Sequence, residues 1–247
     1  NALYLLHHHI ASETGLHSDK IYDTDLWIIS PGVPKDADIV KKAQKIGVPI
    51  VGEIEFASWF TDAPIVAVTG SNGKTTTVYI LSEMCQSEYV QSIMGGNMGI
   101  PFSERVLEEI INPKQNRVFI LEISSFQMEF ILHFKPYISL LLNITPDHLD
   151  RYESMEEYKS AKFNMIQNQS SDDMIIFNAD DPSFDNQFDG YPPVKISFSL
   201  YKKENAIFSV NQSKIYTKEN DKLIYLNEIA LAGKHNLSNL LAAATVA

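Results

Sequence analysis

The sequence predicts an α/β fold: a central, mostly parallel P-loop-type sheet flanked by helices, with a small antiparallel sheet. Short, continuously apolar runs such as residues 65–69 alternate with helix-like stretches such as residues 74–86, which is typical of parallel strands covered on both faces. A glycine-rich loop joins these two segments. After Pro193, short strand-like runs with polar turns replace the alternation, which indicates antiparallel pairing.

The elements follow in order along the chain. Expected strands, each a short apolar run, are residues 26–30, 49–51, 65–69, 118–123, 137–143 and 174–178. Expected helices are residues 36–46, 53–60, 74–86, 102–111 and 154–166, and a last helix from Asn236 onward. The helix at 154–166 begins with a capping box at Ser154. Short strands at 194–200, 206–210, 214–217 and 222–226 are assigned to the antiparallel sheet. A connector at 62–64 predicts a partial N-terminal domain, residues 1–62, and a central domain, residues 63–247.

Composition and charge narrow the class of protein. The hydrophobic fraction of 45% and the charged fraction of 21% are those of an ordinary globular protein. The net charge of −11 argues against nucleic acid as a partner, and the best apolar run, residues 138–142, is too short to span a membrane. No signal-peptide pattern is visible and Cys85 is the single cysteine, so we expect a cytoplasmic monomer without a disulfide.

The loop after residues 65–69 has the composition of a phosphate-binding loop. It reads Gly70, Ser71, Asn72, Gly73, Lys74, Thr75 and Thr76. Glycines let successive N–H groups face one anion, and the following helix adds its positive N-terminal end. Lys74 is expected to reach the β- and γ-phosphates of a nucleotide, and the Thr75 hydroxyl to bind Mg²⁺. The strict Walker pattern would place a glycine where Val68 stands, so an ordinary tight turn is the alternative.

Two strand ends and one helix add further candidates. Glu122 ends an apolar strand and His148 follows another, where open α/β sheets bind ligands; a salt bridge and a purely structural histidine are the alternatives. Lys162 falls on the apolar face of helix 154–166, where an ammonium needs a reason to be buried. Lys159 lies near the same arc, so helical periodicity alone does not choose between the two lysines.

Several segments resemble the Mur ligase family, and the phosphate loop also resembles the related folylpolyglutamate synthases. The segments are 69–76 (TGSNGKTT), 121–127 (LEISSFQ), 143–152 (NITPDHLDRY), 158–162 (YKSAK), 178–182 (NADDP) and 232–239 (AGKHNLSN). The resemblance implies that Lys162 is carbamylated and that two Mg²⁺ ions are bound by Thr75, Glu122, His148 and Lys162. A carbamate supplies hard oxygen ligands in place of a repelling cation. It also implies that Asn236 and Asn239 face the ATP.

Segments 30–33 (SPGV) and 52–55 (GEIE) resemble most closely the members of the family that add D-glutamate. Segment 95–99 (GGNMG) resembles the family's loop that places an asparagine beside the diphosphate of the substrate. The resemblance implies a Rossmann-like N-terminal domain and substrate contacts from Ser30, Pro31, Gly32, Asn97, Ser124, Gln127 and His148. It implies an ATP-dependent ligase that adds D-glutamate to UDP-N-acetylmuramoyl-L-alanine through an acyl phosphate, in peptidoglycan synthesis. Lys74, Glu122, His148 and Lys162 would be its catalytic residues.

The resemblance begins at residue 26, and we expect both ends to be truncated. A further domain carrying much of the D-glutamate site would follow residue 247, so the chain is expected to be inactive as a ligase by itself. The alternatives are a sister ligase or a folylpolyglutamate synthase-like ligase, a non-catalytic nucleotide-binding module, and a P-loop kinase. Retention of Glu122, His148 and Lys162 together argues against the non-catalytic module, and no lid segment of a kinase is identifiable.

Overall fold

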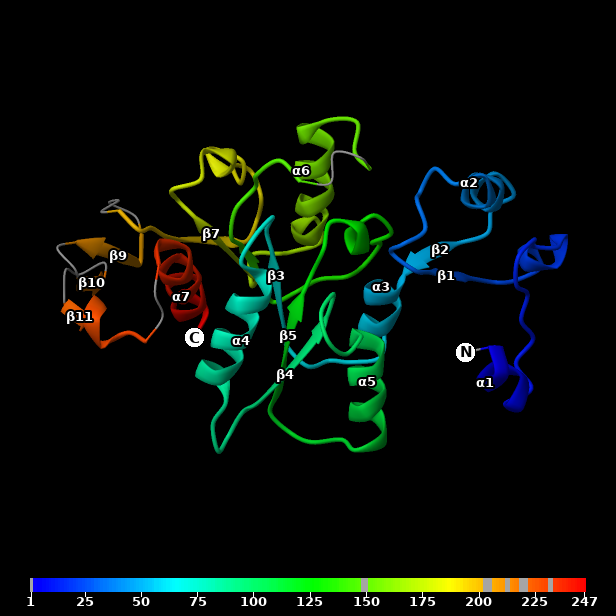
Figure 1. Ribbon diagram of the computed structural model, residues 1–247, viewed down its shortest axis with the longest axis horizontal. Helices are drawn as coiled ribbons and strands as arrows, with labels where there is room; N and C mark the ends of the chain where they lie inside the picture. The colour runs from blue at the N-terminus through cyan, green and yellow to red at the C-terminus, as the bar shows by residue number, and fades with distance from the viewer. Residues whose placement is uncertain (1, 148–150, 202–205, 212–213, 218–221, 231–232) are drawn as a thin grey trace.

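The computed structural model describes residues 2–147, 151–201, 206–211, 214–217, 222–230 and 233–247 (Figure 1). Its strands are β1 (Trp27–Ile29), β2 (Ile50–Gly52), β3 (Ile65–Thr69), β4 (Gln91–Gly96), β5 (Arg117–Glu122), β6 (Ile138–Leu141), β7 (Met174–Asn178), β8 (Val194–Phe198), β9 (Phe208–Asn211), β10 (Lys214–Thr217) and β11 (Lys222–Tyr225). Its α-helices are α1 (Ala2–His7), α2 (Asp38–Lys45), α3 (Glu53–Ser58), α4 (Lys74–Cys85), α5 (Phe102–Ile111), α6 (Met155–Phe163) and α7 (Lys234–Val246). Short 3-10 turns are η1 (Asp19–Tyr22), η2 (Phe126–Met128), η3 (Asn164–Ile166), η4 (Pro182–Phe184) and η5 (Leu226–Glu228).

A six-stranded parallel sheet forms the centre of the molecule, with strand order β4-β5-β3-β6-β7-β8. β3 lies between β5 and β6, so the chain leaves β3 toward one half of the sheet and returns to build the other half. Such a reversal leaves a crevice at the carboxyl ends of the neighbouring strands, where α/β proteins bind ligands. The sheet therefore brings the ends of β3, β5 and β6 together.

The strands of this sheet are buried on both faces, as their continuous apolar sequences predict. In β3, Ile65 and Ala67 join a core cluster with residues of α3, α5 and α6. Val66 and Val68 point to the opposite face and pack with residues of α4 and α7. Full burial of a valine stabilises a fold by roughly 1.5–3 kcal/mol relative to exposure, so β3 is fixed from both sides.

The edges of the sheet differ from the sequence prediction in two places. Residues 194–200 were assigned to the antiparallel sheet, but β8 pairs with β7 in parallel and extends the central sheet. The assignment is wrong because the alternating polar and apolar residues of 194–198 do not reveal which strand lies alongside. Burial in β8 instead increases along the strand, from the exposed Val194 and Lys195 to the buried Ser197 and Phe198. β4 was not predicted, because its last two residues are glycines with low strand propensity. The antiparallel sheet itself is confirmed, with order β11-β10-β9.

Two local predictions can be compared with the helix ends. α4 begins at Lys74, directly after Gly73, as predicted. At the start of α6 the Ser154 hydroxyl accepts from the Glu157 N–H (3.1 Å). The Glu157 carboxylate, however, accepts from the N–H of Glu153 (2.9 Å) and pairs with Lys35, so this capping box is displaced by one residue.

The N-terminal part is a separate parallel pair, β1 and β2, with α2 between them in sequence (Figure 1). α3 connects it to the central sheet through Glu55, which is fully buried. The Glu55 carboxylate accepts the backbone N–H groups of Leu132 (3.0 Å) and Phe134 (2.8 Å) and the indole N–H of Trp59 (2.7 Å). These bonds fix the segment that precedes β6 against α3. The domain boundary at residue 62 stays a prediction.

In the part of the chain that the structure describes, none of the helices combines the length and apolar character needed to cross a bilayer.

Candidate functional site

The loop between β3 and α4 is shaped by two close approaches of its backbone. Gly73 has a φ of +87°, and a Cβ built on it would lie 2.3 Å from the Asn239 side-chain oxygen. A Cβ on Gly70 would lie 2.9 Å from Cβ of Leu142. Any larger residue at position 73 would combine a strained backbone with a clash. Asn239 of α7, which is predicted to face the nucleotide, therefore packs directly against the loop at Gly73.

The segment that follows β6 fixes the phosphate loop through hydrogen bonds. The Asn143 side chain accepts the N–H of Asn72 (2.9 Å) and donates to its carbonyl (3.0 Å). The Ser71 N–H donates to the Asn143 carbonyl (3.0 Å), and the Ser71 hydroxyl donates to the Thr145 carbonyl (2.9 Å). The sequence prediction omitted Asn143 and Thr145 from the site. Their position directly after an apolar strand, where Glu122 and His148 were found, is the signal that could have identified them.

Two lysines converge on one carbonyl of the loop. The ammonium groups of Lys74 and Lys162 both donate to the Gly70 carbonyl, at 2.9 Å and 3.2 Å. Burial lowers the pKa of Lys74, against the opposing effects of Glu122 and Asp147. Burial, and then the nearby charge of Lys74, lower the pKa of Lys162 to about 7, while Asp147 opposes the shift. A phosphate bound at the loop would offset the burial of Lys74 by accepting a charge-assisted hydrogen bond from its ammonium.

The structure shows which of the two lysines of α6 is buried beside the phosphate loop, a choice that helical periodicity left open. Lys162 is 2% exposed and its ammonium lies 4.5 Å from the centre of the Tyr158 ring. The Tyr158 hydroxyl in turn lies 3.1 Å from the Ser71 hydroxyl. Lys159 is only half-buried and lies over Phe163, away from the loop. Lys162 is therefore the lysine that faces the phosphate loop.

Oxygen ligands suited to a hard cation meet at the carboxyl end of β5. The Thr75 hydroxyl donates to one oxygen of the Glu122 carboxylate (2.7 Å), and the Asn97 amide donates to the other (2.9 Å). Glu122 is 2% exposed, so its charge is shielded from water. No group of three or more His, Cys, Asp or Glu side chains that could hold a metal occurs among the described residues. A Mg²⁺ here would complete its shell with water or phosphate oxygens, which is this ion's usual preference.

The remaining predicted residues that the structure describes lie in three places. Ser124 donates through its N–H to the Gln127 side chain (3.0 Å), just beyond β5, and Gln127 is buried. Asn236 is half-buried on α7, one turn before Asn239. Ser30, Pro31 and Gly32 form a turn after β1, and the Pro31 carbonyl accepts a hydrogen bond from Arg151 in the loop before α6, which the prediction omitted. His148 lies outside the described residues.

The fold and this site define an α/β protein with a phosphate loop whose strand-end carboxylate faces the loop. The chain matches the Mur ligase middle domain over residues 68–247. It therefore belongs to the Mur ligase family.

Sequence relatives agree with this assignment. The chain is 40% identical over 248 residues to the UDP-N-acetylmuramoylalanine–D-glutamate ligase of Christiangramia forsetii, an alignment that covers 98% of this chain and 55% of that protein. It is also 40% identical to the enzyme of the same name from Salinibacter ruber, over 95% of this chain and 53% of that protein. The chain thus spans about half the length of the curated relatives it matches.

Solved structures share the fold. The UDP-N-acetylmuramate:L-alanyl-γ-D-glutamyl-meso-diaminopimelate ligase of Neisseria meningitidis superposes with a TM-score of 0.65 at 17% identity, covering 99% of this chain and 81% of that one. The MurF ligase of Thermotoga maritima, solved in complex with ADP, gives a TM-score of 0.56 at 17% identity, over 85% of this chain and 56% of that one. At these identities the likeness concerns the fold alone.

Proposed function

We propose that this chain is the nucleotide-binding part of an ATP-dependent ligase that adds D-glutamate to UDP-N-acetylmuramoyl-L-alanine in peptidoglycan synthesis. The observation that carries the proposal is the convergence of Lys74, Lys162 and the Thr75–Glu122 pair on one phosphate loop. The relatives at 40% identity, both named UDP-N-acetylmuramoylalanine–D-glutamate ligase, support the choice of substrates.

The reaction would begin with attack of the muramoyl-alanine carboxylate on the γ-phosphate of ATP. Lys74 and the loop N–H groups would hold the phosphates, so that catalysis rests on positioning and on charge neutralisation. The amine of D-glutamate then attacks the acyl carbon of the acyl phosphate, inorganic phosphate leaves, and loss of a proton from nitrogen gives the amide. Asn97, Ser124 and Gln127 lie near the carboxyl end of β5, where they could contact the muramoyl-alanine substrate; His148 is proposed to join them.

Mg²⁺ fits the oxygen ligands of Thr75 and Glu122, and when bound it would neutralise charge on the phosphates. A second Mg²⁺ is proposed at Glu122, His148 and a carbamylated Lys162. Carbamate formation needs a neutral amine, and a pKa of about 7 leaves Lys162 substantially neutral near pH 7. Lys162 is also buried, which protects a carbamate from hydrolysis by bulk water.

The test uses the complete natural protein with ATP, Mg²⁺, UDP-N-acetylmuramoyl-L-alanine and a panel of single amino acids. We expect ADP and phosphate to appear with D-glutamate, together with the nucleotide-linked dipeptide product. Turnover with another amino acid, or with a folate substrate, would identify a sister ligase instead. Nucleotide binding without turnover on any of them would identify a non-catalytic module.

A further inference from the structure

The guanidinium of Arg151, in the loop before α6, joins the turn after β1 to the segment just beyond η2. One of its terminal nitrogens donates to the Pro31 carbonyl (2.9 Å), and the other donates to the Val33 carbonyl (3.3 Å). The second nitrogen also pairs with the Glu129 carboxylate (3.0 Å). A single side chain thus binds two backbone carbonyls of the turn after β1 and a carboxylate located just beyond η2.

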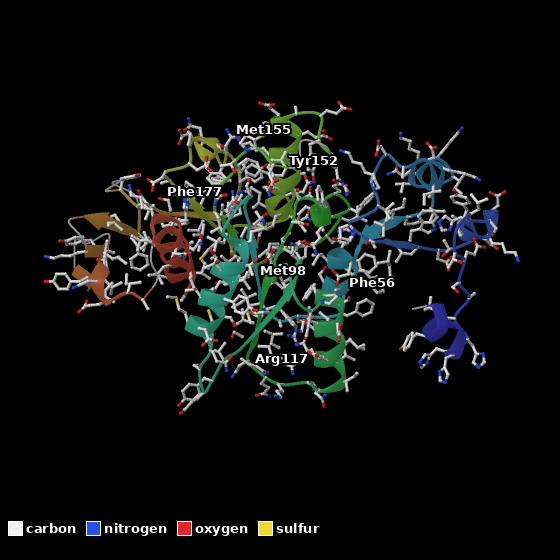
Figure 2. All side chains as sticks on the ribbon, viewed as in Figure 1. Phe56, Met98, Arg117, Tyr152, Met155 and Phe177 are labelled. Atoms are coloured by element: carbon white, nitrogen blue, oxygen red, sulfur yellow. The ribbon has the colours of Figure 1, made fainter. Side chains whose placement is uncertain are left out.

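The side chain of Arg151 is also held in place by aromatic residues and by Glu129. Its guanidinium lies 4.2 Å from the centre of the Phe126 ring, and Tyr152, labelled in Figure 2, stacks on the same ring at 5.8 Å. The Tyr152 hydroxyl donates to the second oxygen of Glu129 (3.1 Å). The side chains of Arg151 and Glu129 are 17% and 4% exposed, so water competes little with these contacts.

The segments that Arg151 contacts are distant in sequence, and both carry residues expected to contact the substrate. The turn carries Ser30, Pro31 and Gly32, and the segment from Ser124 to Glu129 carries Ser124 and Gln127. Arg151 itself follows Asp147 by four positions in the loop after β6. The family resemblance assigns substrate contacts to the turn, Ser124 and Gln127 are proposed above as substrate contacts, and His148 is proposed as one in the loop that carries Arg151. Their relative positions decide whether one substrate can contact all of them at once, and errors near 1 Å can cost about 10²-fold in rate.

We propose that Arg151 is a positioning residue. It fixes the turn carrying Ser30, Pro31 and Gly32 relative to the segment beyond β5 that carries Ser124 and Gln127, and this relative position sets the affinity for the nucleotide-linked substrate. This inference rests on the proposed function for its choice of substrate. A lysine cannot replace Arg151, because a single ammonium lacks the planar fork that reaches two carbonyls and a carboxylate together.

A second ion pair links the same two parts and provides a matched control. Lys35, two residues beyond Val33, pairs with Glu157 of α6 at 2.6 Å. Its side chain is 51% exposed and that of Glu157 32% exposed, and exposed pairs of this kind contribute little. Lys35→Met should therefore leave the turn in place, although it removes a shorter ion pair than the one Arg151 makes.

The experiment compares wild type, Arg151→Met, Arg151→Lys and Lys35→Met in the complete natural protein. Steady-state kinetics give KM for UDP-N-acetylmuramoyl-L-alanine, KM for ATP and kcat. Hydrogen–deuterium exchange of the peptide covering residues 30–36 reports on the turn without any reaction. The Val33 N–H, which donates to the Ser30 carbonyl (3.0 Å), should be protected in the wild type.

We expect Arg151→Met to raise KM for the nucleotide-linked substrate about fivefold or more, about 1 kcal/mol, and to speed exchange of residues 30–36. KM for ATP should stay within about twofold, because Asn143 and Thr145 hold the phosphate loop independently. kcat should change less than KM, since bound substrate itself supports the turn at saturation. Arg151→Lys should show the same KM defect in a folded protein, and Lys35→Met should behave as wild type.

Wild-type KM and wild-type exchange in Arg151→Lys would overturn the proposal, even if Arg151→Met does not fold. A parallel rise of KM for ATP would also overturn it, because general damage rather than positioning would then explain the defect. A wild-type protein without turnover would refute the proposed function. The exchange comparison would still decide whether Arg151 holds the turn.

Discussion

Replacing Lys162 with methionine should change how the stability of the protein depends on pH. Lys162 is 2% exposed, and burial together with the charge of Lys74 lowers its pKa from 10.5 to about 7. Between these two values the unfolded chain binds a proton that the folded protein does not. The free energy of unfolding therefore rises with pH from about 7 upward. Below pH 7 both states are protonated, and Lys162 adds no further pH dependence.

The magnitude follows from the width of this window. Each pH unit within it contributes about 1.4 kcal/mol, and the partial titration near pH 7 reduces the first unit. From pH 7 to pH 9 the wild type should gain about 2 kcal/mol relative to Lys162→Met. Methionine keeps the apolar stem of the side chain and cannot titrate, so subtraction of its curve removes the effect of most other groups.

The assay is urea unfolding followed by far-UV circular dichroism, on both variants across this pH range, in buffer depleted of CO₂. Parallel stability curves for wild type and Lys162→Met would refute the reasoning, since they would mean that the ammonium is hydrated in the folded protein. Bicarbonate added at pH 8 should then stabilise the wild type alone, because a carbamate forms on the folded state and shifts the equilibrium. Equal effects on both variants would argue against a carbamate at Lys162.

The other predictions concern the phosphate loop and α3. Lys74→Met should weaken ATP binding more than tenfold, about 1.4 kcal/mol; unchanged affinity by calorimetry would remove the phosphate-loop interpretation. Gly73→Ala should abolish ATP binding because of the clash with Asn239, whereas Gly47→Ala, at a similar φ of +84° with open space around it, should bind normally. Glu55→Gln should destabilise the chain by about 1–3 kcal/mol in urea unfolding, and a loss below 0.5 kcal/mol (roughly the scatter of surface substitutions) would contradict its role as a buried acceptor.

The sequence could predict those parts of the fold whose burial is uniform. β3 and β7 begin and end where the apolar runs do, because both faces of these strands are covered. β4 was not predicted because its own residues have a weak strand signal; its extended structure is determined by its parallel pairing with β5. β8 was placed in the wrong sheet because the alternation of polar and apolar residues in its sequence cannot reveal which strand lies alongside, and its burial follows the position along the strand rather than the face.

The candidate site was predictable to the extent that its residues follow strands directly. Lys74, Thr75 and Glu122 occupy the positions that strand-end geometry predicts, and the structure brings Thr75 and Glu122 into contact. Arg151 could not be predicted from pattern, because its partners Pro31 and Val33 contribute backbone carbonyls that carry no side-chain signal. Contacts of this kind depend on how distant segments pack.

The placement of charge in this chain is itself an indication of anion binding. The protein carries a net charge of −11, yet two ammonium groups, those of Lys74 and Lys162, share one carbonyl at the phosphate loop, and burial lowers the pKa of both. A fold selected for stability alone would not bury two like charges together, since each is desolvated and each repels the other. For Lys74, a phosphate bound at the loop offsets the cost of burial, because the ammonium then gains a charge-assisted hydrogen bond. For Lys162, the proposed carbamate replaces the like charge with oxygen ligands for Mg²⁺. Nucleotide binding and metal binding together therefore account for the burial of both lysines.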